Sequence, residues 1–413
     1  MSFFHDVYRS FRECLRTIVV VPTLLFLAIC VALFTTMTEA MSQIPIASRP
    51  DHESSTQPNV HFAFSAPTSY FLPSLSSTEP SSFDPTTTNF GLISKPYDSD
   101  VSLPNVGNYT DWQRFSHHVS ELNTKAPDHI SYHVLYLARH GQGYHNLAER
   151  YYGTEAWDCY YSLLDGDLKS NITWSDAHLS KLGSEQARLQ SRFWTSQIER
   201  EKMLVPEKYF VSPMERACLT AEITFQPLQQ SGTLGVAEFI PTVKELLREA
   251  NGVHTCDRRS KRSVIAANYL EWKIEDGFSE DDELWDPVYR ETDQALTYRA
   301  ALLLDDILRL SQDGSAGKGS FLSLTAHGGI NLAITRAIGH REFQINVGSA
   351  IAVLVKAERQ EGKRPTQHFG GKGQTAPSCV SDPLQAGLPG YKSFKEYVDE
   401  VEANASVLSI KLS

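Results

Sequence analysis

Arginine, histidine and glycine follow directly after an apolar run of strand length, in the segment Leu-Tyr-Leu-Ala-Arg-His-Gly at residues 135–141. Buried parallel strands are apolar, and ligands of open α/β sheets bind beyond the carboxyl ends of such strands. Arg139 offers a fixed positive charge and a planar set of donors that suits phosphate or carboxylate. His140 can act as a nucleophile, as an acid or base, or as a metal ligand, and Gly141 lets the backbone turn sharply or approach a ligand. Taken alone, the segment also allows a purely structural role.

A second strand-like run, at 209–212, is followed by Pro213 and then by Arg216. Ser212 is a favourable N-cap and Pro213 suits a first helical turn, so a helix is predicted to begin here. Arg216 would then lie in the first turn, near the positive end of the helix dipole. A cation is unfavourable there, which indicates a bound anion between the two; pairing with a nearby carboxylate is the alternative.

A third run, at 321–325, repeats the first pattern, because His327 and two glycines come after it. Carboxyl ends of parallel strands meet at one edge of a sheet. The two histidines and the two arginines are therefore predicted to form one anion-binding site at that edge.

The elements that must position these residues alternate between strands and helices. Strands are predicted at 133–138, 209–212, 321–325 and 351–355, and helices at 179–198, 213–225, 292–311 and 329–338. Such alternation is typical of the α/β class, here a three-layer α/β/α sandwich with a mostly parallel central sheet. The acidic run at 275–286 is predicted to be a solvated insertion.

Composition narrows the class of partner. The chain of 413 residues has a formal net charge of -11, and 41% of its residues are hydrophobic, enough for a sizeable core. An acidic balance argues against a nucleic-acid-binding protein, which would show a basic face. It leaves room for a local basic pocket that binds an anionic substrate.

The N-terminus carries an apolar segment at 17–34, preceded by Arg9, Arg12 and Arg16. About 18 apolar residues are just enough for a transmembrane helix, whereas a signal-peptide core has about 7–15. The arginines predict that residues 1–16 stay cytoplasmic and that the rest is translocated. We therefore expect a signal anchor at 17–36 with a luminal or extracellular catalytic part; secretion after cleavage near residue 40 is the alternative.

Residues 37–107 are rich in Ser, Thr and Pro and lack periodicity apart from scattered aromatic residues. This composition predicts a disordered stalk, followed by a catalytic domain at 108–413. Sequons for N-glycosylation at Asn108, Asn171 and Asn404 agree with a luminal placement.

Four cysteines lie in the predicted globular part: Cys159, Cys218, Cys256 and Cys379. No Cys-x-x-Cys spacing occurs, which argues against a zinc ribbon or a thioredoxin-type site. The cysteines could form disulfides in an oxidising compartment, and the sequence leaves their pairing open. His254 near Cys256 lacks further partners at ligand spacing, so no metal site is predicted.

Together these motifs resemble those of the histidine phosphatase superfamily, which has the fold of the cofactor-dependent phosphoglycerate mutases. The similar segments are Ala-Arg-His-Gly at 138–141 with Asn146, the helix entry at 174–186, Ser-Pro-Met-Glu-Arg-Ala at 212–217, and Thr-Ala-His-Gly-Gly at 325–329. Leu-Leu-Arg-Glu at 246–249 and His-Thr-Cys-Asp-Arg-Arg at 254–259 resemble the fungal phosphomutase-like branch. All motifs occur in the order of the family, over about residues 130–360.

The resemblance implies an enzyme in which His140 attacks phosphorus and becomes a phosphohistidine. Arg139, Arg216 and His327 would surround the phosphate oxygens, and Asn146 would add a neutral donor.

A backbone carbonyl around Gly141 is expected to hold the second ring nitrogen of His140 and so to fix its tautomer. No metal or other cofactor is expected, since guanidinium and imidazole groups take the place of Mg²⁺. The expected partner is a small phosphorylated substrate.

A carboxylic acid must protonate the leaving oxygen and later deprotonate water. Glu249 is the candidate, with Glu245 as the alternative and a surface role beside Arg248 as the simplest other reading. Arg258 and Arg259 are predicted to bind substrate, although short basic runs are also often merely solvated.

We predict a phosphatase rather than a mutase. A mutase must keep water from its phosphoenzyme while an intermediate reorients, and a luminal, tethered enzyme has less use for a glycolytic mutase. A phosphomutase of the phosphoglycerate mutase type is one alternative. A membrane-anchored binding protein without turnover is another, and the presence of both histidine and both arginine motifs speaks against it.

Overall fold

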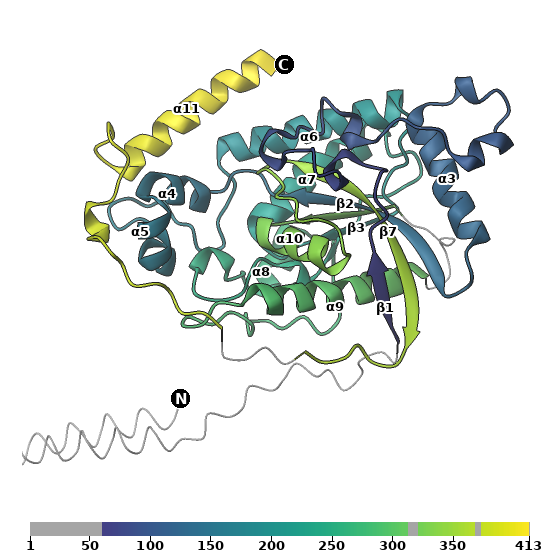
Figure 1. Cartoon of the computed structure of the whole chain (residues 1–413). Coiled ribbons are helices and arrows are strands. Elements are labelled where there is room, and N and C mark those ends of the chain that lie inside the picture. Colours follow the sequence, from purple (N-terminus) through teal and green to yellow (C-terminus); the bar gives the residue numbers. More distant parts are fainter. Residues whose placement is uncertain (1–59, 313–320, 368–372, 413) are drawn as a thin grey trace, which may run out of the picture. The chain divides into compact units, whose positions relative to one another are not determined.

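A mixed sheet forms the centre of the protein in the computed structural model, which describes residues 60–312, 321–367 and 373–412. Its seven strands run in the order β1-β7-β2-β6-β3-β4-β5 (Figure 1). Strands β2, β6, β3, β4 and β5 are parallel neighbours, whereas β7 is antiparallel to both β2 and β1. The bounds are β1 Val60–Ser65, β2 Ile130–Arg139, β3 Lys208–Val211, β4 Thr242–Val243, β5 Lys273–Ile274, β6 Phe321–Ala326 and β7 Ala350–Glu361.

Helices cover both faces of this sheet (Figure 1). Val134 and Tyr136 of β2 belong to a buried cluster with α3, α6 and α7, while Leu135 and Leu137 pack with α9 and α10 on the other face. Alternate residues of an apolar strand thus serve two layers, which confirms the predicted α/β/α sandwich. The helices are α3 Asp111–Lys125, α4 Tyr144–Tyr152, α5 Thr154–Cys159, α6 Lys181–Arg200, α7 Glu215–Gln230, α8 Arg262–Asn268, α9 Asp293–Gln312, α10 Gly328–Ala337 and α11 Phe394–Leu412.

The start of α7 differs from the prediction by two residues. The helix begins at Glu215 with Met214 as its N-cap; the Met214 side chain makes no capping bond, and Oδ1 of Asp176 accepts from the Glu215 N–H at 3.0 Å. Ser212 is therefore not the N-cap. Arg216 nevertheless lies in the first turn, as the sequence indicated.

The segment 60–107 packs onto the sheet, so the predicted disordered stalk is wrong for these residues. β1 pairs with β7, and Phe62 and Phe83 are buried on one face of the sheet while Phe71 and Phe90 are buried on the other. Between β1 and α3 the chain makes several short 3-10 turns, and Phe71, Phe83 and Phe90 each lie in or beside a different turn. Buried positions spaced in this way follow neither a helical nor a strand period, and so the sequence showed only scattered aromatic residues.

The N-terminal predictions fall on residues 1–59, outside the described part of the chain. They comprise the cytoplasmic segment, the anchor at 17–36 and the first part of the stalk. Among the helices that the structure describes, none is both long and apolar enough to cross a bilayer. The anchor and the luminal placement stay predictions.

A disulfide joins Cys159, at the end of α5, to Cys379 in the C-terminal segment. Cys218 and Cys256 are buried and unpaired. The pairing that the sequence left open therefore ties together two regions that are 220 residues apart.

Candidate active site

Three neighbouring parallel strands end side by side at the predicted site. Arg139 of β2 pairs with Ala326 of β6, and Val211 of β3 pairs with Thr325 of β6. The next residues along these strands are His140, His327 and Ser212. The rings of His140 and His327 have centroids 5.0 Å apart, which confirms that the two histidine motifs meet at one edge of the sheet.

His140 is 2% exposed and is held at both ring nitrogens. Its Nδ1 lies 2.7 Å from the carbonyl oxygen of Gly141, and its Nε2 accepts from Nε of Arg216 at 3.3 Å. These partners assign the proton to Nδ1 and leave a lone pair on Nε2. Burial, with the Arg216 charge beside it, holds the pKa of His140 well below its usual value. The ring is therefore neutral, as an attacking nitrogen must be.

Gly141 contributes through its backbone. A Cβ at this position would clash with the carbonyl group of Gly183 in α6, so the loop after β2 can lie against α6 only without a side chain. The Gly141 N–H donates to Oγ1 of Thr220 at 3.0 Å. The predicted tautomer-fixing carbonyl is present, whereas direct binding of substrate by Gly141 stays a prediction.

Arg216 is 1% exposed, and each of its nitrogens has a partner. Besides His140, it donates from Nη1 to the carbonyl oxygen of Cys256 at 2.6 Å and from Nη2 to Oδ1 of Asp257 at 2.8 Å. The carboxylate alternative raised for Arg216 is thus present together with its contact to His140. Asp257 orients the guanidinium rather than removing it from the site.

Asp257 also binds a second arginine that the sequence did not suggest. Both Nη atoms of Arg290 lie 3.1 Å from its Oδ2. Burial alone would raise the pKa of Asp257, but Arg290 and Arg216 outweigh this and lower it, so the carboxylate is charged. No local motif marked Arg290, because its pairing with Asp257 and its place in one cavity with Glu249 arise only in the folded chain.

Arg139 and His327 each keep a buried nitrogen without a partner among the described residues, Nε in Arg139 and Nδ1 in His327. Arg139 donates from Nη1 to the carbonyl oxygen of Ile345 at 3.0 Å, and Nε2 of His327 lies 2.7 Å from Oγ of Ser212. Buried polar atoms are rarely left unpaired, and such atoms beside a neutral nucleophile suit a bound anion.

The glycines after His327 allow this arrangement. A Cβ on Gly328 would lie 3.1 Å from Cζ of Arg139, and a Cβ on Gly329 would clash with Oε1 of Glu249. Arg139 and Glu249 approach the start of α10 so closely that neither Gly328 nor Gly329 can carry a side chain without a shift of its neighbour.

Glu249 lies against this start of α10. Its Oε2 accepts from the Gly329 N–H at 2.8 Å, and its Oε1 accepts from the N–H groups of Ile330 and Ala250 at 3.2 and 2.9 Å. A cavity of about 640 Å³ begins at Glu249 and Gly329 and extends past Arg290. The structure therefore brings Glu249 to the site, because it binds the backbone of Gly329, two residues after His327 in the sequence.

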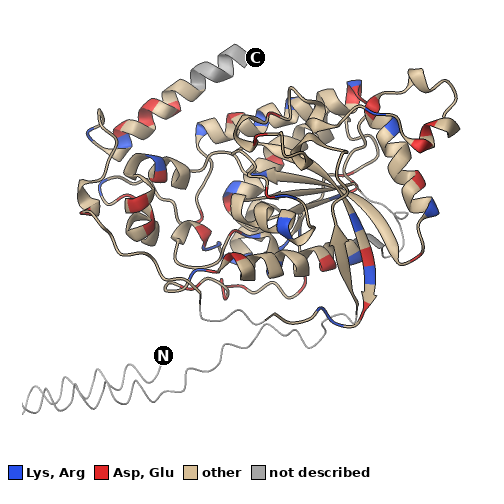
Figure 2. Cartoon of the chain, viewed as in Figure 1, with Lys and Arg blue, Asp and Glu red and all other residues tan. Residues whose placement is uncertain are grey.

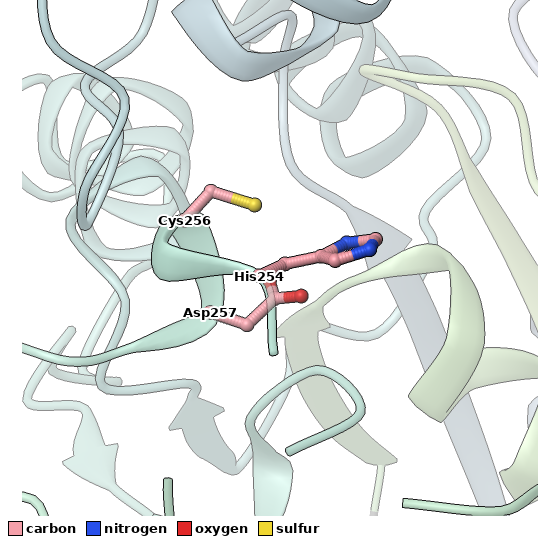
Figure 3. Close-up of side chains that lie close together, drawn as sticks. All are labelled: His254, Cys256 and Asp257. Carbon is pink, nitrogen blue, oxygen red and sulfur yellow. The ribbon is translucent and has the colours of Figure 1, made fainter. Parts of the chain in front are cut away.

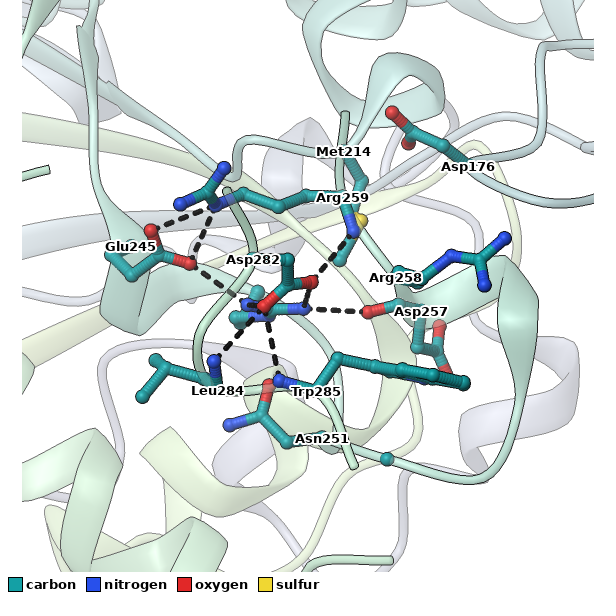
Figure 4. A network of polar contacts seen from close by, with 12 residues as sticks. Asp176, Met214, Glu245, Asn251, Asp257, Arg258, Arg259, Asp282, Leu284 and Trp285 are labelled. Atoms are coloured by element: carbon teal, nitrogen blue, oxygen red, sulfur yellow. Dashed lines mark hydrogen bonds and ion pairs between the residues drawn. The ribbon is translucent and has the colours of Figure 1, made fainter. Parts of the chain in front are cut away.

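Glu245, the alternative acid, belongs to a neighbouring cluster, which reaches the carbonyl oxygen of Asp257 through Nη2 of Arg248 at 2.8 Å (Figure 4). It pairs with Arg248 and Arg259, and Asp282 bonds the side chain of Arg248 and the backbone N–H of Arg259. We name these four residues the arginine network. Asp282 is buried there, so the prediction of a wholly solvated acidic insertion at 275–286 is wrong at this residue.

Arg259 is not available to substrate, and this prediction is wrong. Its side chain is fully buried, and all three of its nitrogens donate to protein oxygens, those of Glu245 and of the loop 279–281 among them. Arg258 instead turns its Nη2 to Asp165 and Ser175 at 2.6 and 2.9 Å and lies over the ring of Trp285. These contacts give Arg258 partners of its own, and substrate binding by Arg258 stays a prediction.

Asn146 serves the first turn of α4. Its Oδ1 accepts from the Gly143 N–H at 3.0 Å. A nearby buried histidine, His145, has its ring centroid 5.3 Å from that of His140 and an unpartnered Nδ1. His145 was not among the predicted catalytic residues, and only its place beside His140 in the fold reveals it. A phosphate contact from Asn146 stays a prediction.

His254, Cys256 and Asp257 form the one group in the described residues with metal-ligand composition (Figure 3). Both oxygens of Asp257 are already taken by Arg216 and Arg290, and two guanidinium groups beside a site repel a metal cation. Burial also raises the pKa of the Cys256 thiol well above its usual value, which opposes the thiolate that metals bind. The group suits the orientation of arginines better than the binding of a metal.

The positive charge of the site comes from a few buried side chains. Elsewhere, acidic and basic residues intermix along the described helices and strands (Figure 2). Arg139, Arg216 and Arg290 face Asp257 and Glu249 around His140. This local balance suits a small anion.

Comparison with known proteins places the chain among fungal relatives, although no family model matches it. It is 46% identical over 296 residues to a probable phosphoglycerate mutase of Arthroderma benhamiae, covering 72% of this chain and 85% of that protein. It is 34% identical to the probable phosphoglycerate mutase PMU1 of Saccharomyces cerevisiae, covering 64% of this chain and 90% of that protein. A solved ecdysone phosphate phosphatase from Bombix mori, in complex with tungstate, aligns over 63% of this chain and 95% of its own, with 15% identity and a TM-score of 0.32. From its fungal relatives and the motifs assembled at His140, the chain belongs to the phosphoglycerate mutase-like family of the histidine phosphatase superfamily.

Proposed function

We propose that this protein is a phosphomonoester hydrolase that works through a phosphohistidine on His140. The observation that carries the proposal is a neutral His140 whose Nε2 accepts from Arg216, in one site with an unpartnered Nε of Arg139 and an unpartnered Nδ1 of His327. A phosphate dianion would take the Nε–H of Arg216 that Nε2 now accepts, which frees the lone pair to attack phosphorus in line. Arg139, Arg216 and His327 then hold the three non-bridging oxygens as charge develops on them.

Glu249 is the proposed acid. Its carboxyl group gives a proton to the leaving oxygen as the P–O bond breaks, and the carboxylate then takes a proton from the water that attacks the phosphohistidine. This second step breaks the P–N bond, releases inorganic phosphate and restores neutral His140 and protonated Glu249.

Hydrolysis is favoured over mutase activity by the lining of the cavity beyond Glu249. Phosphoglycerate carries a carboxylate beside its phosphate, and binding it requires a second cation. Among the described residues of that lining, Arg290 is the cation, and it already pairs with Asp257, while Glu249, Glu291 and Asp293 are acidic. The proposed substrate is therefore a phosphomonoester without a second anionic group.

The test uses the full chain with p-nitrophenyl phosphate in the presence of excess chelator. We expect turnover to resist the chelator and His140→Ala to lower kcat/KM by at least about 10³-fold. The matched control is His133→Ala, which removes another buried histidine of β2, one that lies against Ser131 at 2.8 Å, and should alter kcat/KM by less than about 10-fold. Full activity in His140→Ala, or loss of activity with chelator, would contradict the mechanism.

A further inference from the structure

The C-terminal segment 373–379, which we name the strap, is bound at one end to the backbone of Arg290. Arg290 and Gln374 exchange two backbone hydrogen bonds of 2.7 and 2.9 Å. Gly373 has a φ of +105°, and a Cβ there would clash with the carbonyl oxygen of Arg290. The strap therefore lies directly against the backbone of the arginine that supports Asp257.

The other end of the strap is fastened to α5. The disulfide between Cys379 and Cys159 closes this end. Just beyond it, the N–H and Oγ of Ser381 both donate to Oε1 of Glu155, at 3.1 and 2.9 Å. The strap is thus held at two points, at Arg290 by backbone hydrogen bonds and at α5 by the disulfide and the Ser381 hydrogen bonds.

The middle of the strap lines a cavity. Thr375, Ala376 and Pro377 face His254 and Asp158 across a space of about 340 Å³, which Arg290 and Gln374 also line. Arg290 and Gln374 border the larger cavity that begins at Glu249 as well. The two cavities therefore meet at the same pair of residues.

Little besides its two ends holds the strap. Thr375, Pro377 and Ser378 are exposed, and Ala376 is only partly buried. A segment with so few buried apolar contacts depends on its fastenings for its position. Opening the disulfide would remove the covalent fastening and leave the middle of the strap held between Gln374 and the hydrogen bonds from Ser381 to Glu155.

We propose that the strap, held by the Cys159–Cys379 disulfide, is the wall that selects the leaving group of the substrate. This inference rests on the proposed phosphatase function, because the leaving oxygen must lie at Glu249 and the rest of the alcohol must then extend toward Arg290 and Gln374. The fixed strap admits a compact leaving group and limits a bulky one. A released strap would admit both.

The experiment compares phenyl phosphate with 1-naphthyl phosphate for the wild-type chain and for Cys159→Ser/Cys379→Ser. We expect the ratio of kcat/KM, naphthyl over phenyl, to rise at least about 5-fold in the double variant, through a lower KM for the naphthyl ester. Dithiothreitol should produce the same rise in the wild type and no further change in the double variant. An unchanged ratio in both would overturn the proposal.

A second variant keeps the disulfide and tests the same wall if the double variant does not fold. Ala376→Trp should narrow the cavity and lower the naphthyl ratio at least about 5-fold, while phenyl phosphate turnover stays within about 2-fold of wild type. Equal effects on the two esters would contradict the role of the strap. If the wild-type chain hydrolysed neither ester, the proposed phosphatase function would fail instead, and the two failures are distinguishable.

Discussion

Two arginines, Arg139 in the candidate active site and Arg259 in the arginine network, differ in how their donors are used. Arg259 gives all three nitrogens to protein oxygens, including both carboxylate oxygens of Glu245. Arg139 donates to the carbonyl oxygen of Ile345, its Nε has no partner, and no carboxylate of the described residues lies within ion-pair distance of it. The two have the same side chain, partly buried in Arg139 and fully buried in Arg259, but only Arg139 has donors left for a ligand.

This difference separates a structural charge from a functional one. A buried guanidinium without a counter-ion is costly, and a fold keeps one where a ligand later supplies the negative charge. In the arginine network Arg248 and Arg259 are balanced by Glu245 and Asp282 within the protein. Around His140 the proposed phosphate dianion would supply the missing charge.

The largest expected effect is that replacing Arg139 lowers activity whereas replacing Arg259 lowers stability. Arg139→Ala should lower kcat/KM by about 10²–10³-fold while changing the free energy of unfolding little, because it removes a cation that only the transition state neutralises. Arg259→Ala should lower the free energy of unfolding by about 3–5 kcal/mol, since Glu245 loses a buried partner, yet leave kcat/KM of the folded enzyme within about 3-fold. Urea denaturation measures the free energy of unfolding of both variants, and steady-state kinetics measures their kcat/KM. Parallel losses of stability and activity in the two variants would remove the distinction.

A smaller effect is expected from replacing the two candidate acids, Glu249 in the candidate active site and Glu245 in the arginine network. Glu249→Gln should slow the hydrolysis of an alkyl phosphate by about 10²-fold, because the alkoxide then leaves without a proton. With p-nitrophenyl phosphate, whose leaving group needs no proton, we expect a burst of about one equivalent followed by slow turnover, since water lacks its base. Stopped-flow absorbance detects the burst.

Glu245→Gln is the matched control for this experiment. It should show no burst and should lower stability rather than kcat, because Glu245 binds Arg248 and Arg259. A burst in Glu245→Gln, or equal slowing of both esters in Glu249→Gln, would show that Glu249 is not the acid.

The sequence predicted the parts of the site that depend on strand ends. Arg139, His140 and His327 follow apolar runs, and parallel neighbours bring such ends together whatever the rest of the chain does. It could not separate Arg259 from a substrate-binding arginine, since its partners Glu245 and Ser279 are brought to it only by the folded loops. Asp257 was seen as part of a basic run, and its pairing with Arg290 appears only in three dimensions.

The fold shows the same limit at its N-terminal side. Each of the eight helices and strands that were predicted begins within three residues of an observed one, although β7 extends six residues further than predicted and α3 and α11 were not predicted. The segment 60–107 was not predicted, because Phe71, Phe83 and Phe90 are buried from irregular turns whose spacing carries no period. Composition alone then indicated disorder, although a few aromatic residues were enough to hold the segment on the sheet.

The smallest expected effect distinguishes the two regions by pH. Burial holds the pKa of His140 and of His327 well below their usual value near 6.5, so each is neutral when folded and takes up a proton only on unfolding as the pH falls below that value. The stability that each contributes is therefore complete above about pH 6.5 and is lost on acidification, by up to about 1.4 kcal/mol per pH unit and histidine. In the arginine network, burial raises the pKa of Asp282 but Arg248 outweighs it and lowers the pKa below 3.8, so this carboxylate loses its contribution only in stronger acid. Between pH 7 and pH 5, His140→Gln should consequently lose about 1–2 kcal/mol less than the wild type in urea denaturation, whereas Arg259→Ala should follow the wild-type slope. If His140→Gln had the wild-type slope, His140 would already carry its proton in the folded protein, and a protonated Nε2 has no lone pair with which to attack phosphorus.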